Sequence, residues 1–200
     1  MSIIPAFEIG VWNAWIFMIW AWIDMLALSL VGKAVCQRAS GLASEMKTSH
    51  AYKICSYVSM LIELIAIAYS IFLPFKLGTT WFYAGLTIFL LGLVVLIIAS
   101  VNFATASMNE PITRGMYRHS RHPAYLALLL IYLSVSIATA SWVFLLVLIV
   151  QLVSIIIAAV NEERYCLEKY GDTYREYMNR TPRWLGLSKS RPRTDWDGSK

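Results

Sequence analysis

Two long stretches without an acidic or basic residue constrain the fold of this chain most strongly. No Asp, Glu, Lys or Arg occurs in residues 79–107 or in residues 123–161. A helix needs about 20 apolar residues to cross a bilayer core about 30 Å thick, whereas a core helix of a soluble domain keeps a polar face. The chain is also 58% hydrophobic and only 14% charged, against roughly 25% charged in soluble domains. We therefore predict an integral membrane protein.

The apolar runs predict an all-α, polytopic helical bundle with about five transmembrane helices. The fourth and fifth come from one run, 124–160, which would measure about 55 Å as a single helix and so needs a turn near Thr139–Trp142. We expect a cytoplasmic C-terminal helix over 161–178, a single domain over 1–187, and a flexible tail over 188–200. The predicted spans are 11–31, 54–73, 80–104, 124–139 and 142–160.

The basic residues predict the orientation of the bundle. With these spans, 16 of the 17 Lys and Arg residues fall on one side, which the positive-inside rule makes cytoplasmic, with the N-terminus outside. The membrane would be the plasma membrane in a prokaryote or the endoplasmic reticulum in a eukaryote. Because the basic residues flank apolar spans, the net charge of +5 does not indicate nucleic-acid binding. The cysteines (Cys36, Cys55 and Cys166) lack metal or disulfide spacing, so we predict no metal.

Within the spans, a few residues depart from a plain apolar pattern. Gly85 and Gly92 lie one heptad apart, which favours close helix packing on one face. Asp24 and Glu63 are acids inside predicted spans, where carboxylates are costly and often functional. A transporter would use such acids for ions or protons, but each could also meet a local polar partner, and both interpretations stay open.

Two segments at the cytoplasmic side carry most of the candidate chemistry. Residues 115–125 read Gly-Met-Tyr-Arg-His-Ser-Arg-His-Pro-Ala-Tyr, and Pro123 suits the first turn of a helix. That places His122 at a helix N-terminus, where unpaired amides favour anions. Glu162 and Glu163 follow the fifth span, and the helical hairpin returns them to the same surface. An acid pair beside Arg and His can bind a zwitterion, although a basic anchoring loop and a solvated charged helix remain open.

Together the two segments resemble the isoprenylcysteine carboxyl methyltransferase family. The resemblance covers residues 115–184 and rests on Arg121-His-Pro-x-Tyr125, Glu162-Glu163, Tyr170-Gly171, Tyr174, Tyr177 and Pro182-Arg183. Cys166 and Thr181 depart from the usual Leu and Val. The chain looks like a compact, microbial-type homologue. The resemblance implies an enzyme that transfers a methyl group from S-adenosylmethionine to the carboxylate of a C-terminal prenylated cysteine.

The resemblance also implies roles for individual residues. Arg121, His122 and Glu163 would be catalytic. Arg121 is the candidate to orient a carboxylate, either of the substrate or of the cofactor, and His122 would serve as base only for an amine or phenol acceptor. Because a prenylated substrate arrives from the lipid, we also expect the apolar faces of spans three to five, with Leu128 and Ile131, to form a tunnel for it. Which of the two glutamates meets the cofactor stays open. The residues expected around the cofactor are Tyr117, Arg118, His119, His122, Pro123, Tyr125, Leu126, Glu162 and Glu163.

Other functions share parts of this pattern. Phospholipid or other lipid methyltransferases and NADPH-dependent sterol reductases are similar in the same region, and a small transporter could use Asp24 and Glu63. Transporters commonly contain inverted repeats, and we find no internal repeat. The expected partners are a prenylated-cysteine protein or a small lipophilic acid, together with membrane lipids. The natural acceptor and the oligomeric state are left open.

Overall fold

A computed structural model describes residues 8–20, 50–107 and 110–186 of the chain. Residues 15–20 are helical where the first described part ends, and the described part of the chain forms no β-strand beyond one bridge between Asn13 and Pro74. The fold class is therefore the predicted all-helical membrane bundle. Its elements are α3 (His50–Ser70), α4 (Thr80–Ala104), the 3-10 helix η1 (Gly115–Arg118), α5 (Pro123–Thr139), α6 (Trp142–Tyr170) and α7 (Asp172–Arg180).

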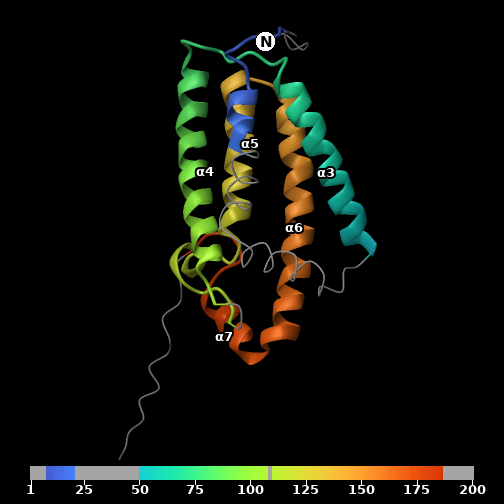
Figure 1. Ribbon diagram of the computed structural model, residues 1–200, viewed down its shortest axis with the longest axis vertical. Helices are drawn as coiled ribbons and strands as arrows, with labels where there is room; N and C mark the ends of the chain where they lie inside the picture. The colour runs from blue at the N-terminus through green and yellow to red at the C-terminus, as the bar shows by residue number, and fades with distance from the viewer. Residues whose placement is uncertain (1–7, 21–49, 108–109, 187–200) are drawn as a thin grey trace, which may run out of the picture.

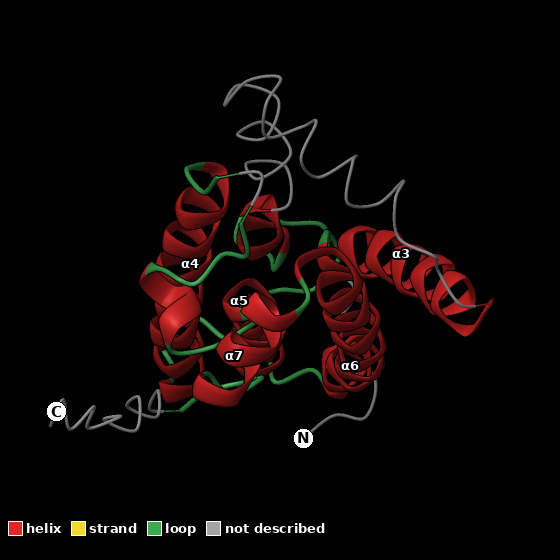
Figure 2. Cartoon of the chain, turned by 90° about the horizontal axis from the view of Figure 1, so that it is seen from below, coloured by secondary structure: helices red, strands yellow, loops and turns green. Residues whose placement is uncertain are grey.

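The long helices α3, α4, α5 and α6 run side by side in one bundle (Figure 1). One end of the bundle carries the connection from α3 to α4 and the turn from α5 to α6. The opposite end carries the start of α5, the end of α6 and α7, which lies across that end beneath α5 in the view of Figure 2. Residues far apart in the sequence thus meet at the end that the charge pattern predicts to be cytoplasmic.

The observed helices can be compared with the predicted spans. α4 coincides with the predicted span 80–104, α5 and α6 begin within one residue of theirs, and α3 begins four residues earlier. By length and composition, α3, α4 and α6 can each cross a membrane, while α5 is apolar but shorter, at 17 residues. Most of the predicted first span, including Asp24, lies outside the described residues, as does the tail.

The predicted cytoplasmic helix over 161–178 is wrong as one continuous element. α6 continues without interruption to Tyr170, and the chain then turns at Gly171 before α7 begins. Gly171 has φ +54°, a left-handed conformation that glycine adopts without the steric cost of a Cβ. Tyr170 therefore lies on α6, whereas Tyr174 and Tyr177 lie on α7.

The predicted glycine face of α4 packs against α5. A Cβ at Gly85 would lie 2.6 Å from the Cβ of Ala138, and one at Gly92 would lie 3.1 Å from a side-chain atom of Ile131. A substitution at Gly85 would have to displace the backbone of α5, because the nitrogen of Ala138 lies 2.7 Å from that Cβ position. These two glycines let the helices approach closely, which is the packing role expected of small residues in membranes.

The turn between α5 and α6 falls at the predicted position near Thr139–Trp142, where small and β-branched residues gather. α5 ends at Thr139, Ala140 adopts a left-handed conformation with φ +52°, and Ser141 caps α6 by accepting a hydrogen bond from the amide of Phe144. This tight connection holds α5 and α6 antiparallel. It therefore returns the residues after the apolar part of α6 to the end where α5 begins.

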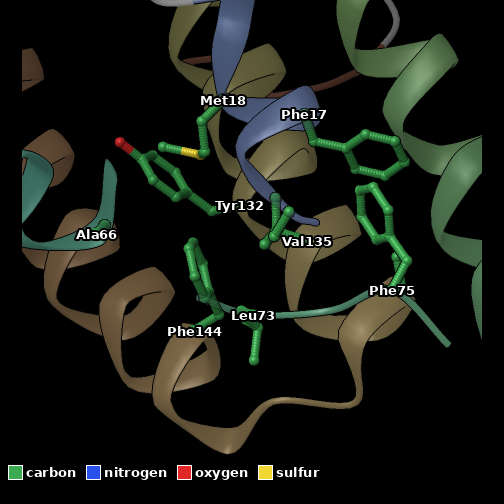
Figure 3. Packing of buried hydrophobic residues seen from close by; sticks show 10 residues of the cluster. Phe17, Met18, Ala66, Leu73, Phe75, Tyr132, Val135 and Phe144 are labelled. Atoms are coloured by element: carbon green, nitrogen blue, oxygen red, sulfur yellow. The ribbon is translucent and has the colours of Figure 1, made fainter. Parts of the chain in front are cut away.

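Apolar packing fixes the end of the bundle opposite α7. Phe17 and Met18 of the N-terminal helical segment pack with Tyr132, Val135 and Phe144 in one buried cluster (Figure 3). The outward faces of the long helices are apolar as well, which would be unfavourable against water but suits hydrocarbon. Exposed side chains on these faces include Leu61, Leu64 and Ile65 on α3, Leu91, Val94 and Ile97 on α4, and Leu146, Ile149 and Val153 on α6.

Candidate functional site

The loop before α5 is fastened to the segment that follows α7. The amide of Arg121 donates to the carbonyl of Pro182 at 3.1 Å, and the Ser120 hydroxyl donates to the carbonyl of Arg183 at 3.2 Å. Ser120 is 1% exposed, and its hydroxyl also accepts from the amide of His122 at 3.1 Å. These bonds place the side chains of Arg121 and His122 against the end of α6. The 3-10 helix η1 is held in a similar way, because the Tyr177 hydroxyl of α7 donates to the carbonyl of Tyr117.

Glu163 is the centre of the ionic contacts at this end of the bundle. Its side chain is 4% exposed, and both oxygens are engaged by cations. The guanidinium of Arg183 donates to it twice, from Nε at 2.9 Å and from Nη2 at 2.7 Å. Arg121 Nη1 lies 3.1 Å away and His122 Nε2 lies 3.2 Å away. Because its carboxylate is already fully matched, Glu163 is suited to joining the loop, α6 and the C-terminal segment rather than to contacting a ligand.

His122 lies between the two glutamates. Its Nε2 faces Glu163, its Nδ1 lies 3.5 Å from Glu162, and the residue is 7% exposed. Burial acts to lower the pKa of His122, but hydrogen bonds and charge attraction from Glu162 and Glu163 outweigh burial and raise that pKa above its ordinary value. The two carboxylates therefore favour the protonated, cationic form of the imidazole.

Arg121 has hydrogen-bonding capacity to spare. Its side chain is 10% exposed. Among the described residues, its Nε and Nη1 are buried donors without a hydrogen-bond partner; Nη1 comes within ion-pair distance of Glu163 without the alignment of a hydrogen bond. Unmade hydrogen bonds of a buried charged group are costly. A carboxylate bound beside Arg121 would remove that cost, since a guanidinium matches a carboxylate with parallel donors.

Glu162 is the more accessible of the two glutamates. Its side chain is 37% exposed, and it accepts a hydrogen bond from the hydroxyl of Tyr125 in the first turn of α5. The rings of Tyr125 and His122 stack with centroids 5.5 Å apart, and Trp184 approaches His122 from another direction at 6.1 Å. An accessible carboxylate beside aromatic rings and a buried guanidinium thus forms the chemically available part of the site.

The remaining predicted site residues fall into two groups. Pro123 is buried at the first position of α5, and Leu126 is half-buried one turn later, with its amide donating to the carbonyl of His122. Tyr117 is half-buried on η1, while Arg118 and His119 are exposed. The structure thus brings Arg121, His122, Tyr125 and the glutamates together, and places Arg118 and His119 at its outer edge.

Sequence reasoning missed the roles of two C-terminal residues. Arg183 was part of the recognised pattern but was not assigned to the site, although it makes the bidentate contact with Glu163. Trp184 was not singled out, although its ring borders His122. The family resemblance ends at Pro182-Arg183, so the sequence did mark these residues as part of the motif. Their local sequence does not show that the chain folds back there.

A cavity of about 360 Å³ begins at Tyr125 and extends into the membrane part of the bundle. It lies between α3, α5 and α6 and is bordered by Trp20. The predicted tunnel along spans three to five is therefore corrected in part. Leu128 lines this cavity, but Ile131 is fully buried in the packing of α4 against α5, and α3 rather than α4 supplies the third wall. The described residues contain no cluster of three or more side chains suited to a metal ion.

Comparison with known families supports a membrane methyltransferase. Residues 75–173, which are 99 of the 200 residues, match the family model described as phospholipid methyltransferase. That family belongs to the same superfamily as the isoprenylcysteine carboxyl methyltransferases. The matched region includes Arg121, His122 and both glutamates and ends before Arg183. No curated protein matches the chain.

Proposed function

We propose that this protein transfers a methyl group from S-adenosylmethionine to the carboxylate of a lipidic acceptor, of which a prenylated cysteine is the type example. The observation that carries the proposal is the nearly buried Arg121 at one end of a membrane bundle. Its Nε has no hydrogen-bond partner among the described residues, and its Nη1 makes only an ion pair with Glu163. The match of residues 75–173 to a membrane methyltransferase family supports the reaction type.

The residues of the site fit the proposed cofactor. The amino acid part of S-adenosylmethionine carries a carboxylate and an ammonium, and the site offers a guanidinium with free donors and the accessible carboxylate of Glu162. We assign Glu162 rather than Glu163 to the ammonium, because the oxygens of Glu163 are occupied by arginines and His122. The aromatic rings of Tyr125 and Trp184 offer apolar contact to the rest of the molecule. When bound, the cofactor supplies an electrophilic methyl group and leaves as a neutral thioether.

The two carboxylates beside His122 favour a carboxylate acceptor over an amine. A carboxylate is ionised at neutral pH, so it can attack the methyl carbon while the sulfur takes the electron pair of the breaking bond, and no proton moves. An amine acceptor would first have to lose a proton. His122 is the nearest candidate base, and both of its ring nitrogens face carboxylates that stabilise its protonated form. The contribution of the protein is then to align the two reactants and to exclude water.

The position of the site suits a lipidic acceptor. Arg121 and Glu162 flank the charge-free run 123–161, and the cavity that starts at Tyr125 leads into the membrane part of the bundle. An acceptor with a long apolar chain partitions into lipid, while a polar cofactor arrives from water. A site at this boundary can be reached by the acceptor from the lipid and by the cofactor from water.

Cofactor binding tests the proposal directly. Calorimetry on the detergent-solubilised protein should detect binding of S-adenosylhomocysteine and no binding of NADPH. Arg121→Met should weaken the cofactor about tenfold to a hundredfold, as expected for a lost charge-assisted pair, and Glu162→Gln should weaken it as well. Arg164→Met, which removes an exposed cation from the same end of α6, is the matched control. Undiminished affinity in both site variants would overturn the assignment.

A second candidate is methylation of a lipid amine, such as the headgroup of phosphatidylethanolamine. The family match favours it, because the matching model is described as phospholipid methyltransferase. Radiolabelled methyl transfer to farnesylated cysteine, a free fatty acid and phosphatidylethanolamine separates the two. Transfer to the acids with no transfer to the amine would support the carboxylate proposal, and the opposite result would replace it by the amine.

A further inference from the structure

The cavity between α3, α5 and α6 has an unusually polar lining for a position inside an apolar bundle. Membrane-facing surfaces of these helices are mostly apolar, yet the cavity is lined by several side chains that can form hydrogen bonds. They include Trp20, Ser59, Glu63, Tyr125, Tyr132 and Gln151. A cavity meant only for a hydrocarbon chain would gain nothing from such groups, because burying polar atoms without partners costs free energy.

Most of these polar groups satisfy one another. Gln151 is 5% exposed; its amide nitrogen lies 3.2 Å from Glu63 Oε2 and 3.5 Å from the Tyr132 hydroxyl, and its amide oxygen accepts from Ser59. This network holds the carboxyl group of Glu63 in place. Gln151 contacts only Oε2 of Glu63. The other oxygen, Oε1, is thereby fixed in position but does not bond to Gln151.

Two buried atoms of residues that line the cavity have no hydrogen-bond partner among the described residues. Glu63 Oε1 is a buried acceptor, and the indole Nε1 of Trp20 is a buried donor in a residue that is 9% exposed. An acceptor and a donor left over at one cavity call for a group that can both donate and accept. A hydroxyl group has one donor and two acceptor lone pairs and meets that requirement.

The cavity also has the position of an acceptor chamber. Tyr125 lines it at one end and donates to Glu162 at the candidate site. Tyr132, which reaches Gln151, lies seven residues further along α5, a distance of about 10 Å at 1.5 Å per residue. A molecule whose reactive group lies near Tyr125 would therefore place a group about 10 Å along its chain beside Glu63 and Gln151.

We propose that this cavity binds the apolar part of the methyl acceptor and recognises a hydroxyl group part-way along it through Glu63 Oε1 and the Trp20 indole. The inference rests on the proposed function for the identity of the ligand as an acceptor, and it narrows that acceptor to hydroxylated amphiphiles. Leu128, Ile155 and Met60 supply the apolar contacts between the polar positions.

A matched set of lipids tests the proposal by binding rather than turnover. Stearic and 10-hydroxystearic acids differ by one mid-chain hydroxyl, and the corresponding methyl esters lack the ionised carboxylate. In calorimetry on the full chain in lipid nanodiscs, each hydroxylated member should bind about fivefold to tenfold more tightly than its partner, as one hydrogen bond in a buried site provides. Equal affinities within both pairs would overturn the proposal.

Variants locate the preference. Trp20→Phe removes the indole N–H with little change in shape, and Glu63→Leu removes the acceptor; each should reduce the preference for the hydroxylated member to less than about twofold. Trp81→Phe, on the exposed face of α4, should leave it unchanged. If Glu63→Leu does not fold, Trp20→Phe still decides, and a preference retained in Trp20→Phe contradicts the assignment.

The lipid-binding and cofactor-binding measurements together distinguish this inference from the proposed function. A hydroxyl preference in the methyl esters as well as in the acids, without cofactor binding, would support the cavity and remove the methyltransferase. Cofactor binding with no hydroxyl preference would support the methyltransferase and remove the cavity proposal.

Discussion

Two carboxylates, Glu163 and Glu63, lie within the same bundle in opposite circumstances. Glu163 meets two arginines and a histidine at the end of α6, and each oxygen has a cationic partner. Glu63 lies in α3, where Gln151 donates to one oxygen and no described residue donates to the other. The two carboxylates differ in how many of their oxygens have hydrogen-bond or ion-pair partners within the described part of the chain.

The contrast separates a structural acid from an acid available for binding. A group whose hydrogen bonds are all made within the protein gains nothing from a ligand, and removing it leaves charged partners unmatched. A buried group with an unused acceptor gains a hydrogen bond when a suitable ligand arrives. Glu163 therefore holds the site together, whereas Glu63 has an unused acceptor that can bind a ligand. The predictions below test this difference from its largest consequence to its smallest.

The largest expected effect is that of Glu163→Ala on stability. The change removes the buried anion shared by Arg121 and Arg183 and leaves His122 with Glu162 alone. Breaking a buried ion pair in this way costs about 3–5 kcal/mol. Thermal unfolding in detergent should show a large fall in the midpoint. Glu168→Ala, which removes an exposed acid from the same helix, should have little effect. A Glu163→Ala protein as stable as the Glu168→Ala protein would show that Glu163 does not hold the site together.

Arg183→Met should have a smaller effect of the same kind. It removes the bidentate contact with Glu163 but leaves Arg121 and His122 in place. Since 37% of the Arg183 side chain is exposed, solvent screening reduces the loss to about 1–2 kcal/mol. The same unfolding assay measures it, with Arg175→Met, an exposed arginine of α7, as the control. A loss additive with that of Glu163→Ala in the double variant would argue against a shared contact.

The pH dependence of stability provides a third, smaller test of the contacts between Glu163 and His122. The folded-state pKa of His122 is raised, so protonated His122 stabilises the fold fully below its ordinary pKa of about 6.5. That contribution is lost as pH rises through the raised pKa. The unfolding midpoint should fall over this range in the wild type and fall less in His122→Asn. Equal pH profiles in the two proteins would contradict the assigned electrostatics.

The same contrast shows what sequence could and could not predict. The charge-free runs and the small residues at Thr139–Ser141 were enough to place α4, α5 and α6, because hydrophobic length and turn composition are local properties. The hairpin then implied that Arg121 and His122 meet Glu162 and Glu163, since only one antiparallel return was possible. Spacing failed at Gly171, where a left-handed glycine divides an otherwise helical pattern into two helices.

The distribution of partners between the two glutamates could not be predicted. Adjacent residues on a helix point about 100° apart, and which one receives Arg183 depends on where the segment after α7 returns. The cavity was also beyond local reasoning, because Glu63 and Gln151 are 88 residues apart and meet only through the packing of α3 against α6. Whether the oxygens of a buried acid find hydrogen-bond partners depends on tertiary packing. That packing decides whether the acid has a structural or a ligand-binding role.

The smallest expected effect is that of Glu63→Met on the stability of the protein without ligand. Glu63 has one hydrogen bond to lose, and its removal also relieves an acceptor that the described residues leave unsatisfied. Replacing a poorly matched buried acid by an apolar side chain of similar length is often neutral or stabilising, so the free energy of unfolding should change by less than about 1 kcal/mol. A loss as large as that of Glu163→Ala would mean that Glu63 is structural too. A neutral change accompanied by weaker binding of hydroxylated lipids would instead show that this acid is maintained for its ligand, because the fold alone does not need it.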